Sequence, residues 1–184
     1  MRAFGTGGVR LWNLSREAKL VFTAYVAFTL IGLLTAVLYA YELTGERIFA
    51  GTRDYYSAAP PAAGSGGGPV IELAPDDAQP MVVGMSYRKL LEASHFHFFT
   101  VPVLLLIVSH LFMLAGLRPG TTVAWLLLSW ALSLLHLAAP WLIHYGSDRL
   151  AALMPLSGAG MLLAITVLCA VTTIRMWRPP ATAE

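Results

Sequence analysis

The chain has very little charge for its length. Only 12% of its 184 residues are Asp, Glu, Lys or Arg, whereas 57% are hydrophobic and the mean hydropathy is +0.67. A soluble domain carries roughly 25% charged residues, so this composition indicates an integral membrane protein in contact with the lipid bilayer. The net charge of +2 gives no reason to expect a nucleic-acid partner.

Cysteine is almost missing. The single residue, Cys169, excludes an intrachain disulfide and any CxxC metal or redox motif. The sequence also lacks CxxCH, the motif through which a c-type haem is attached covalently. Because Cys169 lies inside an apolar run, we interpret it as a small packing residue.

Long apolar runs are what the sequence does contain. Four of them, at 20–41, 90–117, 121–143 and 150–176, reach the roughly 20 residues that a membrane-spanning helix needs. The first run exceeds the apolar core of a signal peptide, so we interpret it as a retained helix. Short turns, "GLRPGTT" and "IHYGSDR", join the last three runs. The sequence therefore predicts a single all-α domain over 1–184, an up-down four-helix membrane bundle.

The remaining connection, 42–89, is long. Its stretch "SAAPPAAGSGGGP" is typical of a flexible linker, and "ELTGERIFAGTRDYY" before it is expected to form a short surface helix. Ser86 is expected to cap the second long helix. The two termini and the 116–122 turn carry seven basic and two acidic residues, against five basic and eight acidic at the other ends of the helices. This bias predicts cytoplasmic termini and a periplasmic 42–89 loop.

Ionisable side chains inside the apolar runs are the main functional signal, because burying them in hydrocarbon is costly. At about 1.5 Å per residue, His136 lies about 22 Å from the cytoplasmic turn, His97 about 28 Å, His95 about 31 Å and His144 about 34 Å. His110 lies at only about 9 Å. Four histidines are thus expected to gather in the periplasmic half of the bundle.

Such a cluster favours a haem b site. Haem iron takes one or two axial imidazoles, which two antiparallel helices can supply from opposite faces of the ring. The candidate pairs are His97 with His136 and His95 with His144, and the sequence does not choose between them. Gly158 and Gly160 are candidates for close approach to the haem or for helix packing. The residues expected to pair with the haem propionates are Arg88, Lys89 and Arg149.

Two further residues are candidates for quinol and proton handling. Glu92 is expected at the periplasmic rim, and His110 has no histidine at its own depth on another helix. A second haem would therefore need a ligand from a partner subunit.

A resemblance supports this interpretation. The pattern "LLEASHFHFFTVPVLLLIVSHLF", which follows a long loop and precedes "AAPWLIHY", resembles small four-helix membrane proteins encoded beside multihaem c-type cytochromes in bacterial respiratory clusters. More loosely, it is similar to four-helix b-type cytochromes. The resemblance implies a bacterial inner-membrane subunit that passes electrons from the quinone pool to a periplasmic c-type cytochrome. It implies an electron-transfer subunit rather than a stand-alone enzyme.

Two other functions stay open at this point. His95, His97, His136 and His144 are also candidate ligands for copper or zinc without a porphyrin. Alternatively, the chain is a non-catalytic anchor subunit of a respiratory complex, whose histidines only pack and whose 42–89 loop docks another subunit. Self-association into a homo-oligomer is compatible with each of these functions.

Overall fold

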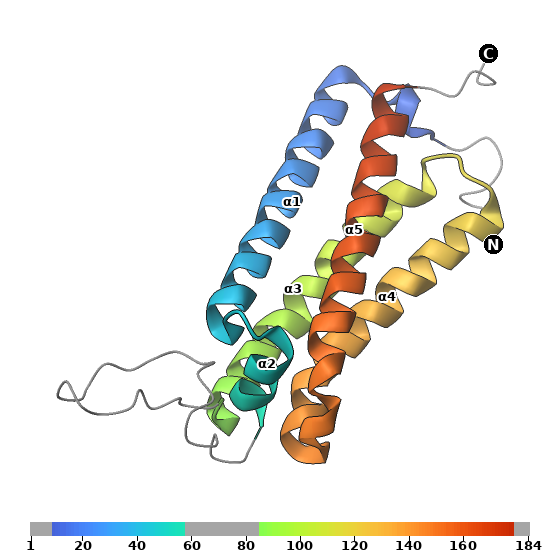
Figure 1. Ribbon diagram of the computed structural model, residues 1–184. Coiled ribbons are helices and arrows are strands. Elements are labelled where there is room, and N and C mark those ends of the chain that lie inside the picture. Colours follow the sequence, from blue (N-terminus) through green and yellow to red (C-terminus); the bar gives the residue numbers. More distant parts are fainter. Residues whose placement is uncertain (1–8, 58–84, 179–184) are drawn as a thin grey trace.

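The computed structural model describes residues 9–57 and 85–178. All regular structure in these ranges is helical (Figure 1). The helices are α1 (Arg16–Thr44), α2 (Ile48–Tyr56), α3 (Tyr87–Met113), α4 (Pro119–Trp141) and α5 (Leu153–Trp177), with the short turns η1 (Leu11–Asn13), η2 (Leu142–Gly146) and η3 (Asp148–Ala152). Four of these helices are long and apolar enough to cross a membrane, which confirms the predicted helical membrane bundle.

The four long helices run in alternating directions. η1 lies beside the end of α5, so both described ends of the chain are at one end of the bundle, and α2 is at the other (Figure 1). There the amide of Met85 donates to the carbonyl of Tyr55 over 2.7 Å, which joins the end of α2 to the chain that enters α3. The predicted cap at the start of α3 is confirmed, because the Ser86 hydroxyl accepts from the Lys89 amide at 3.4 Å.

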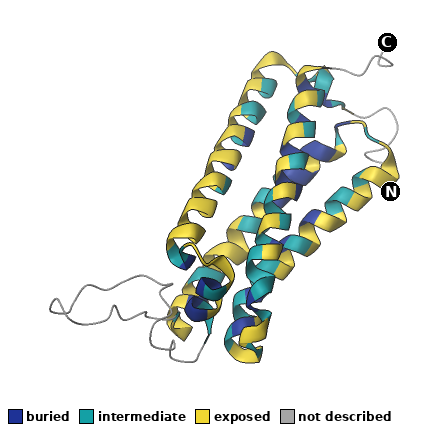
Figure 2. Cartoon of the chain, in the orientation of Figure 1, coloured by how far each residue is buried: buried dark blue, intermediate teal, exposed yellow. Residues whose placement is uncertain are grey.

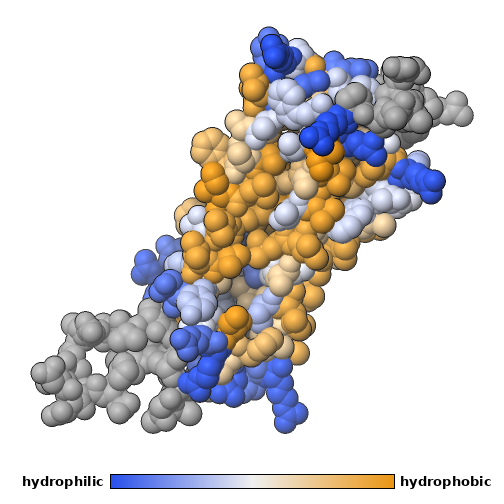
Figure 3. Space-filling view, turned by 45° about the horizontal axis from the view of Figure 1, so that its top comes forward, coloured by the Kyte–Doolittle hydropathy of each residue, from blue (hydrophilic) through white to orange (hydrophobic). Residues whose placement is uncertain are grey.

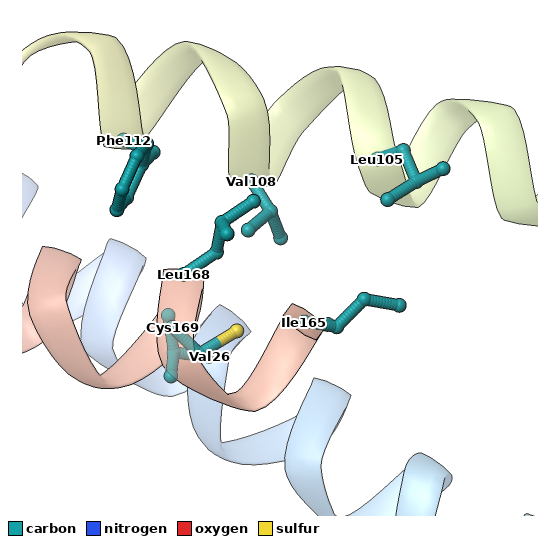
Figure 4. Close-up of a cluster of buried hydrophobic side chains, with 7 residues drawn as sticks. All are labelled: Val26, Leu105, Val108, Phe112, Ile165, Leu168 and Cys169. Carbon is teal, nitrogen blue, oxygen red and sulfur yellow. The ribbon is translucent and has the colours of Figure 1, made fainter. Parts of the chain in front are cut away.

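The main core lies between α3 and α5, where α1 adds one residue. Its buried side chains are Val26, Leu105, Val108, Phe112, Ile165, Leu168 and Cys169 (Figure 4). Cys169 is fully buried among aliphatic groups, in agreement with its interpretation as a packing residue. This core occupies the half of the bundle nearer the chain termini.

α4 and α5 pack closely because small residues line their contact. Ser129 and Ser133 are buried on α4, and their hydroxyls donate to carbonyls of their own helix, at 2.9 Å to Leu126 and 2.8 Å to Ser129. Such local bonds satisfy the hydroxyls without a partner on α5. On α5, a Cβ at Gly160 would approach the Leu132 side chain to 3.0 Å, so glycine lets the two helices come together.

α1 is the least packed of the long helices. Only Val26, Thr29 and Thr44 are buried along it, and Figure 2 shows most of its length as exposed. The face of the bundle shown in Figure 3 is apolar over its middle and hydrophilic at both ends. This pattern is that of a protein surrounded by a bilayer, so the exposed apolar side chains contact lipid.

α2 forms within the predicted stretch and covers one end of the bundle, with Ile48, Phe49 and Arg53 exposed and its other face packed inward. Gly51, Thr52, Asp54 and Tyr55 are buried because α2 crosses the end of the bundle, between the end of α1 and η3. A Cβ at Gly51 would overlap the carbonyl of Thr44, so only glycine allows this sharp corner.

Candidate functional site

His136 is the histidine most firmly held in the bundle. It lies on α4 and faces the first turn of α5, where its Nδ1 atom is 3.3 Å from the carbonyl oxygen of Met154 and 3.3 Å from the hydroxyl of Ser157. The imidazole ring lies against Gly158, since a Cβ at that position would be 3.0 Å from Cε1 and 3.2 Å from Nδ1. The glycine therefore leaves room for the ring between the two helices.

The hydrogen bonds around His136 determine where its proton is. A carbonyl oxygen can only accept, so Met154 requires a proton on Nδ1. The Ser157 hydroxyl donates to the Leu153 carbonyl at 2.5 Å, which leaves the Ser157 oxygen as an acceptor toward His136. Both partners thus favour the tautomer with Nδ1–H, in which Nε2 keeps its lone pair and can bind a metal.

His97 has the same arrangement on the facing helix α3. Its Nδ1 atom lies 2.7 Å from the carbonyl oxygen of Ala93, so Nδ1 carries the proton and Nε2 is the free donor atom. His97 is itself exposed, although at about 100° per residue it lies within about 20° of Leu90 and Val108, both buried, on the same face of α3. The imidazoles of His97 and His136 are close enough to interact electrostatically.

His144 lies where α4 changes into the wider π-helical turn η2, and it is anchored to α2. Its Nδ1 atom is 3.1 Å from the carbonyl oxygen of Tyr56, and its ring meets that of Tyr145 edge to face at 4.7 Å. π-Helical turns occur frequently at functional sites. A third histidine at this end of the bundle therefore has an anchored Nδ1, here through contact between elements far apart in the sequence.

His95 lies apart from these three anchored rings. It is exposed and its ring packs edge to face against Phe96 and Phe99, with centroids 6.0 Å and 5.2 Å away. Nothing described joins it to His144, the alternative partner suggested by the sequence. The structure thus brings the first candidate pair, His97 and His136, near each other.

The other candidate residues lie at the bundle ends. Glu92 is exposed near the start of α3, and His110 is exposed about 20 Å from His97 along the same helix. Arg88, Lys89 and Arg149 are exposed at the end of the bundle that carries His144, in α3 and η3. Their placement allows contact with a charged group at that end.

A metal site of three side chains is not formed by the described residues. Within residues 9–57 and 85–178, no group of three or more His, Cys, Asp or Glu side chains is close enough to hold a metal ion. A copper or zinc site that uses three or more of His95, His97, His136 and His144 is thus not assembled among them. Haem iron needs only two histidines, and those two are present on α3 and α4.

The structure adds residues that the sequence did not point to. Ser157 is 2% exposed and holds His136, and its signal was a polar residue directly before Gly158 in an apolar helix. Ser94 accepts a hydrogen bond from the Trp141 indole at 2.7 Å, one helical turn from His97. The carbonyl of Tyr56 could not have been assigned to His144 from spacing, because 88 residues separate them.

An apolar groove lies between α1 and α3 on the lipid-facing side. It has a volume of about 420 Å³ and is lined by Tyr25, Phe99, Thr100, Val103, Leu104 and Ile107. Thr100 and Leu104 follow His97 by one and two turns on α3, so the groove leads toward the level of that histidine. Tyr25 donates its hydroxyl to the Leu104 carbonyl at 3.3 Å and bridges the two helices.

A single protein-family model covers most of α2 and all of α3, α4 and α5. A model described as a transmembrane helical domain matches residues 49–183, well over half of the chain. The chain belongs to this family, Aq_1264_TM. The family match begins inside α2, so the loosely packed α1 lies outside it. Searches of curated proteins and of solved structures gave no match. The chain is accordingly a multi-pass membrane protein.

Proposed function

We propose that the protein is a haem b electron-transfer subunit that links the quinone pool to a periplasmic c-type cytochrome. The observation that carries this proposal is that His97 and His136 have the same hydrogen-bonded tautomer. Both rings have Nδ1 against a carbonyl acceptor, lie near each other on adjacent helices and therefore present Nε2 as the metal-binding atom. Histidines that bind metals usually donate their other ring N–H to a carbonyl or a carboxylate in this way.

The donor set fits haem b better than a bare metal ion. Two neutral imidazoles from antiparallel helices are the axial ligands that a six-coordinate haem requires, and no covalent attachment motif is needed for haem b. Bound there, the haem would supply one-electron redox chemistry. The chain's own contribution is to orient the two rings, to keep their Nε2 atoms unprotonated and to surround them with apolar side chains.

The charged residues fit the same site. Arg88, Lys89 and Arg149 lie at the end of the bundle nearer His97 and His136, where their side chains could bind carboxylates such as haem propionates. The excess of basic residues at the opposite end supports a bacterial inner-membrane orientation with cytoplasmic termini. In that orientation the haem lies on the periplasmic side, close to a soluble electron acceptor.

Quinol oxidation needs a path for an apolar ligand and an acceptor for its protons. The groove along α3 offers an apolar surface that is open to the bilayer and ends at the level of His97. Glu92 is exposed one to two turns from His97 toward the loop end, where a carboxylate can take up a proton and release it to water. His110, at the other end of α3, is the second candidate for proton handling.

The decisive experiment is spectroscopy of the purified protein. We expect a b-type α-band after reduction and a pyridine haemochrome of haem b. His97→Ala and His136→Ala should each lose most of the bound haem, whereas His95→Ala should retain it. His97→Gly supplied with free imidazole should recover part of the signal. Wild-type protein that has no b-type absorption would refute the function, and haem loss only in His95→Ala and His144→Ala would refute the ligand assignment.

A further inference from the structure

Ser157 has an unusual role for a small residue in an apolar helix. It is 2% exposed, and its oxygen lies 3.3 Å from Nδ1 of His136. Its own proton is directed to the Leu153 carbonyl at 2.5 Å. The three groups form a chain of hydrogen bonds in one direction, from the imidazole N–H to the hydroxyl and on to the carbonyl. Each bond in such a chain polarises the next.

A second buried serine on this interface, Ser133, shows that such a contact is not a packing requirement. Ser133 is also 2% exposed and lies one turn before His136 on α4, yet its hydroxyl bonds to the Ser129 carbonyl of its own helix. Ser157 has the same local option in the Leu153 carbonyl and uses it, but its oxygen additionally faces the histidine. Ser157 lies 3.3 Å from the Met154 carbonyl as well, and it differs from Ser133 chiefly in its contact with the histidine across the interface.

We propose that Ser157 is a positioning residue that holds His136 as the Nδ1–H tautomer and sets the basicity of its Nε2 atom. This inference rests on the proposed haem function. An acceptor on Nδ1–H increases the electron density of the imidazole and makes it a stronger axial ligand. Stronger donation favours ferric over ferrous iron, so the contact with Ser157 lowers the reduction potential of the haem.

The test compares Ser157→Ala with its matched control, Ser133→Ala. Ser157→Ala leaves His136 bonded to the Met154 carbonyl, so the haem should be retained. We expect its midpoint potential to rise above that of the wild type and the g-values of the ferric low-spin signal to change. Ser133→Ala should leave both quantities at the wild-type value, although its stability falls by a similar amount. Ser157→Thr, which keeps the hydroxyl, should restore the wild-type potential.

Other results would overturn the inference. If haem is bound and Ser157→Ala has the same potential and g-values as Ser133→Ala, Ser157 only packs. If Ser157→Ala does not accumulate, Ser157→Cys replaces it, since a thiol is a weaker acceptor of similar size and should raise the potential in the same direction. An unchanged potential in that variant would also refute the role. Wild-type protein without haem b would instead refute the proposed function and, with it, this inference.

Discussion

The indole nitrogen of Trp141 donates a hydrogen bond to the hydroxyl of Ser94 over 2.7 Å and thereby joins the end of α4 to α3. Ser94 and His97 are three residues apart on one helix, and Trp141 follows His136 by five on the other. This bond therefore joins α3 to α4 close to the level of the two histidines. Tyr87 and Tyr145 extend it into an aromatic group, with ring centroids 6.3 Å and 5.8 Å from that of Trp141.

Trp141→Phe should lower the free energy of unfolding by about 0.5–1.5 kcal/mol, because it keeps a large ring but removes the donor. Ser94→Ala should have a similar effect, and the double variant should cost less than the sum of the two, since both remove one bond. Unfolding of the purified protein in detergent measures this. Trp177→Phe is the control: it removes an equivalent bond, to Thr23 at 3.0 Å, at the far end of the bundle. If the double variant loses the sum of the two single losses in free energy of unfolding, the two side chains do not form this bond.

Gly51→Ala should be strongly destabilising, by about 1–3 kcal/mol or more, because its Cβ would overlap the Thr44 carbonyl at the α1–α2 corner. Gly32→Ala is the matched control. A Cβ there has nothing within 4 Å, so the change should be neutral or should stabilise α1 by up to about 1 kcal/mol. Thermal unfolding of both variants provides the comparison. Equal stability of the two proteins would show that α2 does not pack into this corner.

Gly158→Ala and Gly160→Ala separate the histidine site from general helix packing. A Cβ at Gly158 meets the rigid ring of His136 at 3.0 Å, whereas one at Gly160 meets the flexible end of Leu132 at the same distance. We expect Gly158→Ala to displace the imidazole and to reduce haem content severalfold on the proposed function. Gly160→Ala should retain the haem at a stability cost of about 1 kcal/mol. Haem absorbance per mole of protein distinguishes the two variants. Equal haem content in both would contradict the close approach of Gly158 to His136.

Alkaline pH should lower the stability of the bundle end that α2 covers. Burial raises the pKa of Tyr56, and the neighbouring phenols of Tyr55 and Tyr39 raise it further. The folded state therefore keeps the phenol protonated while the unfolded chain releases its proton above about pH 10. Stability from this group is complete below that pH and is lost as the pH rises toward the folded pKa. The free energy of unfolding, measured from about pH 8 to 11, should fall as the pH rises, and Tyr56→Phe should make this fall smaller. If the free energy of unfolding falls equally steeply in Tyr56→Phe, other groups cause the pH dependence.

Periodicity and composition were sufficient to predict the helical bundle. Runs of about 20 apolar residues with so few charges have no soluble alternative, and short turns allow only antiparallel neighbours. The inward position of His136 also followed from its spacing to Ser129 and Ser133, both buried. Which histidines lie near each other did not follow, because depth along a straight helix treats His95 and His97 as nearly equivalent. Their side chains point to different faces, and only packing shows which face another helix covers.

The sequence by itself determined that this chain crosses a membrane several times and carries most of its histidines toward one end. Hydrophobic burial in a bilayer depends on local composition, so it can be read along the chain. The tertiary structure decided which imidazoles are anchored and by what: His136 by Ser157 and Met154, and His144 by Tyr56. Hydrogen bonds require distances near 3 Å between residues that are far apart in sequence. Such distances arise only when α2 closes over the bundle and Gly158 lets α5 approach α4.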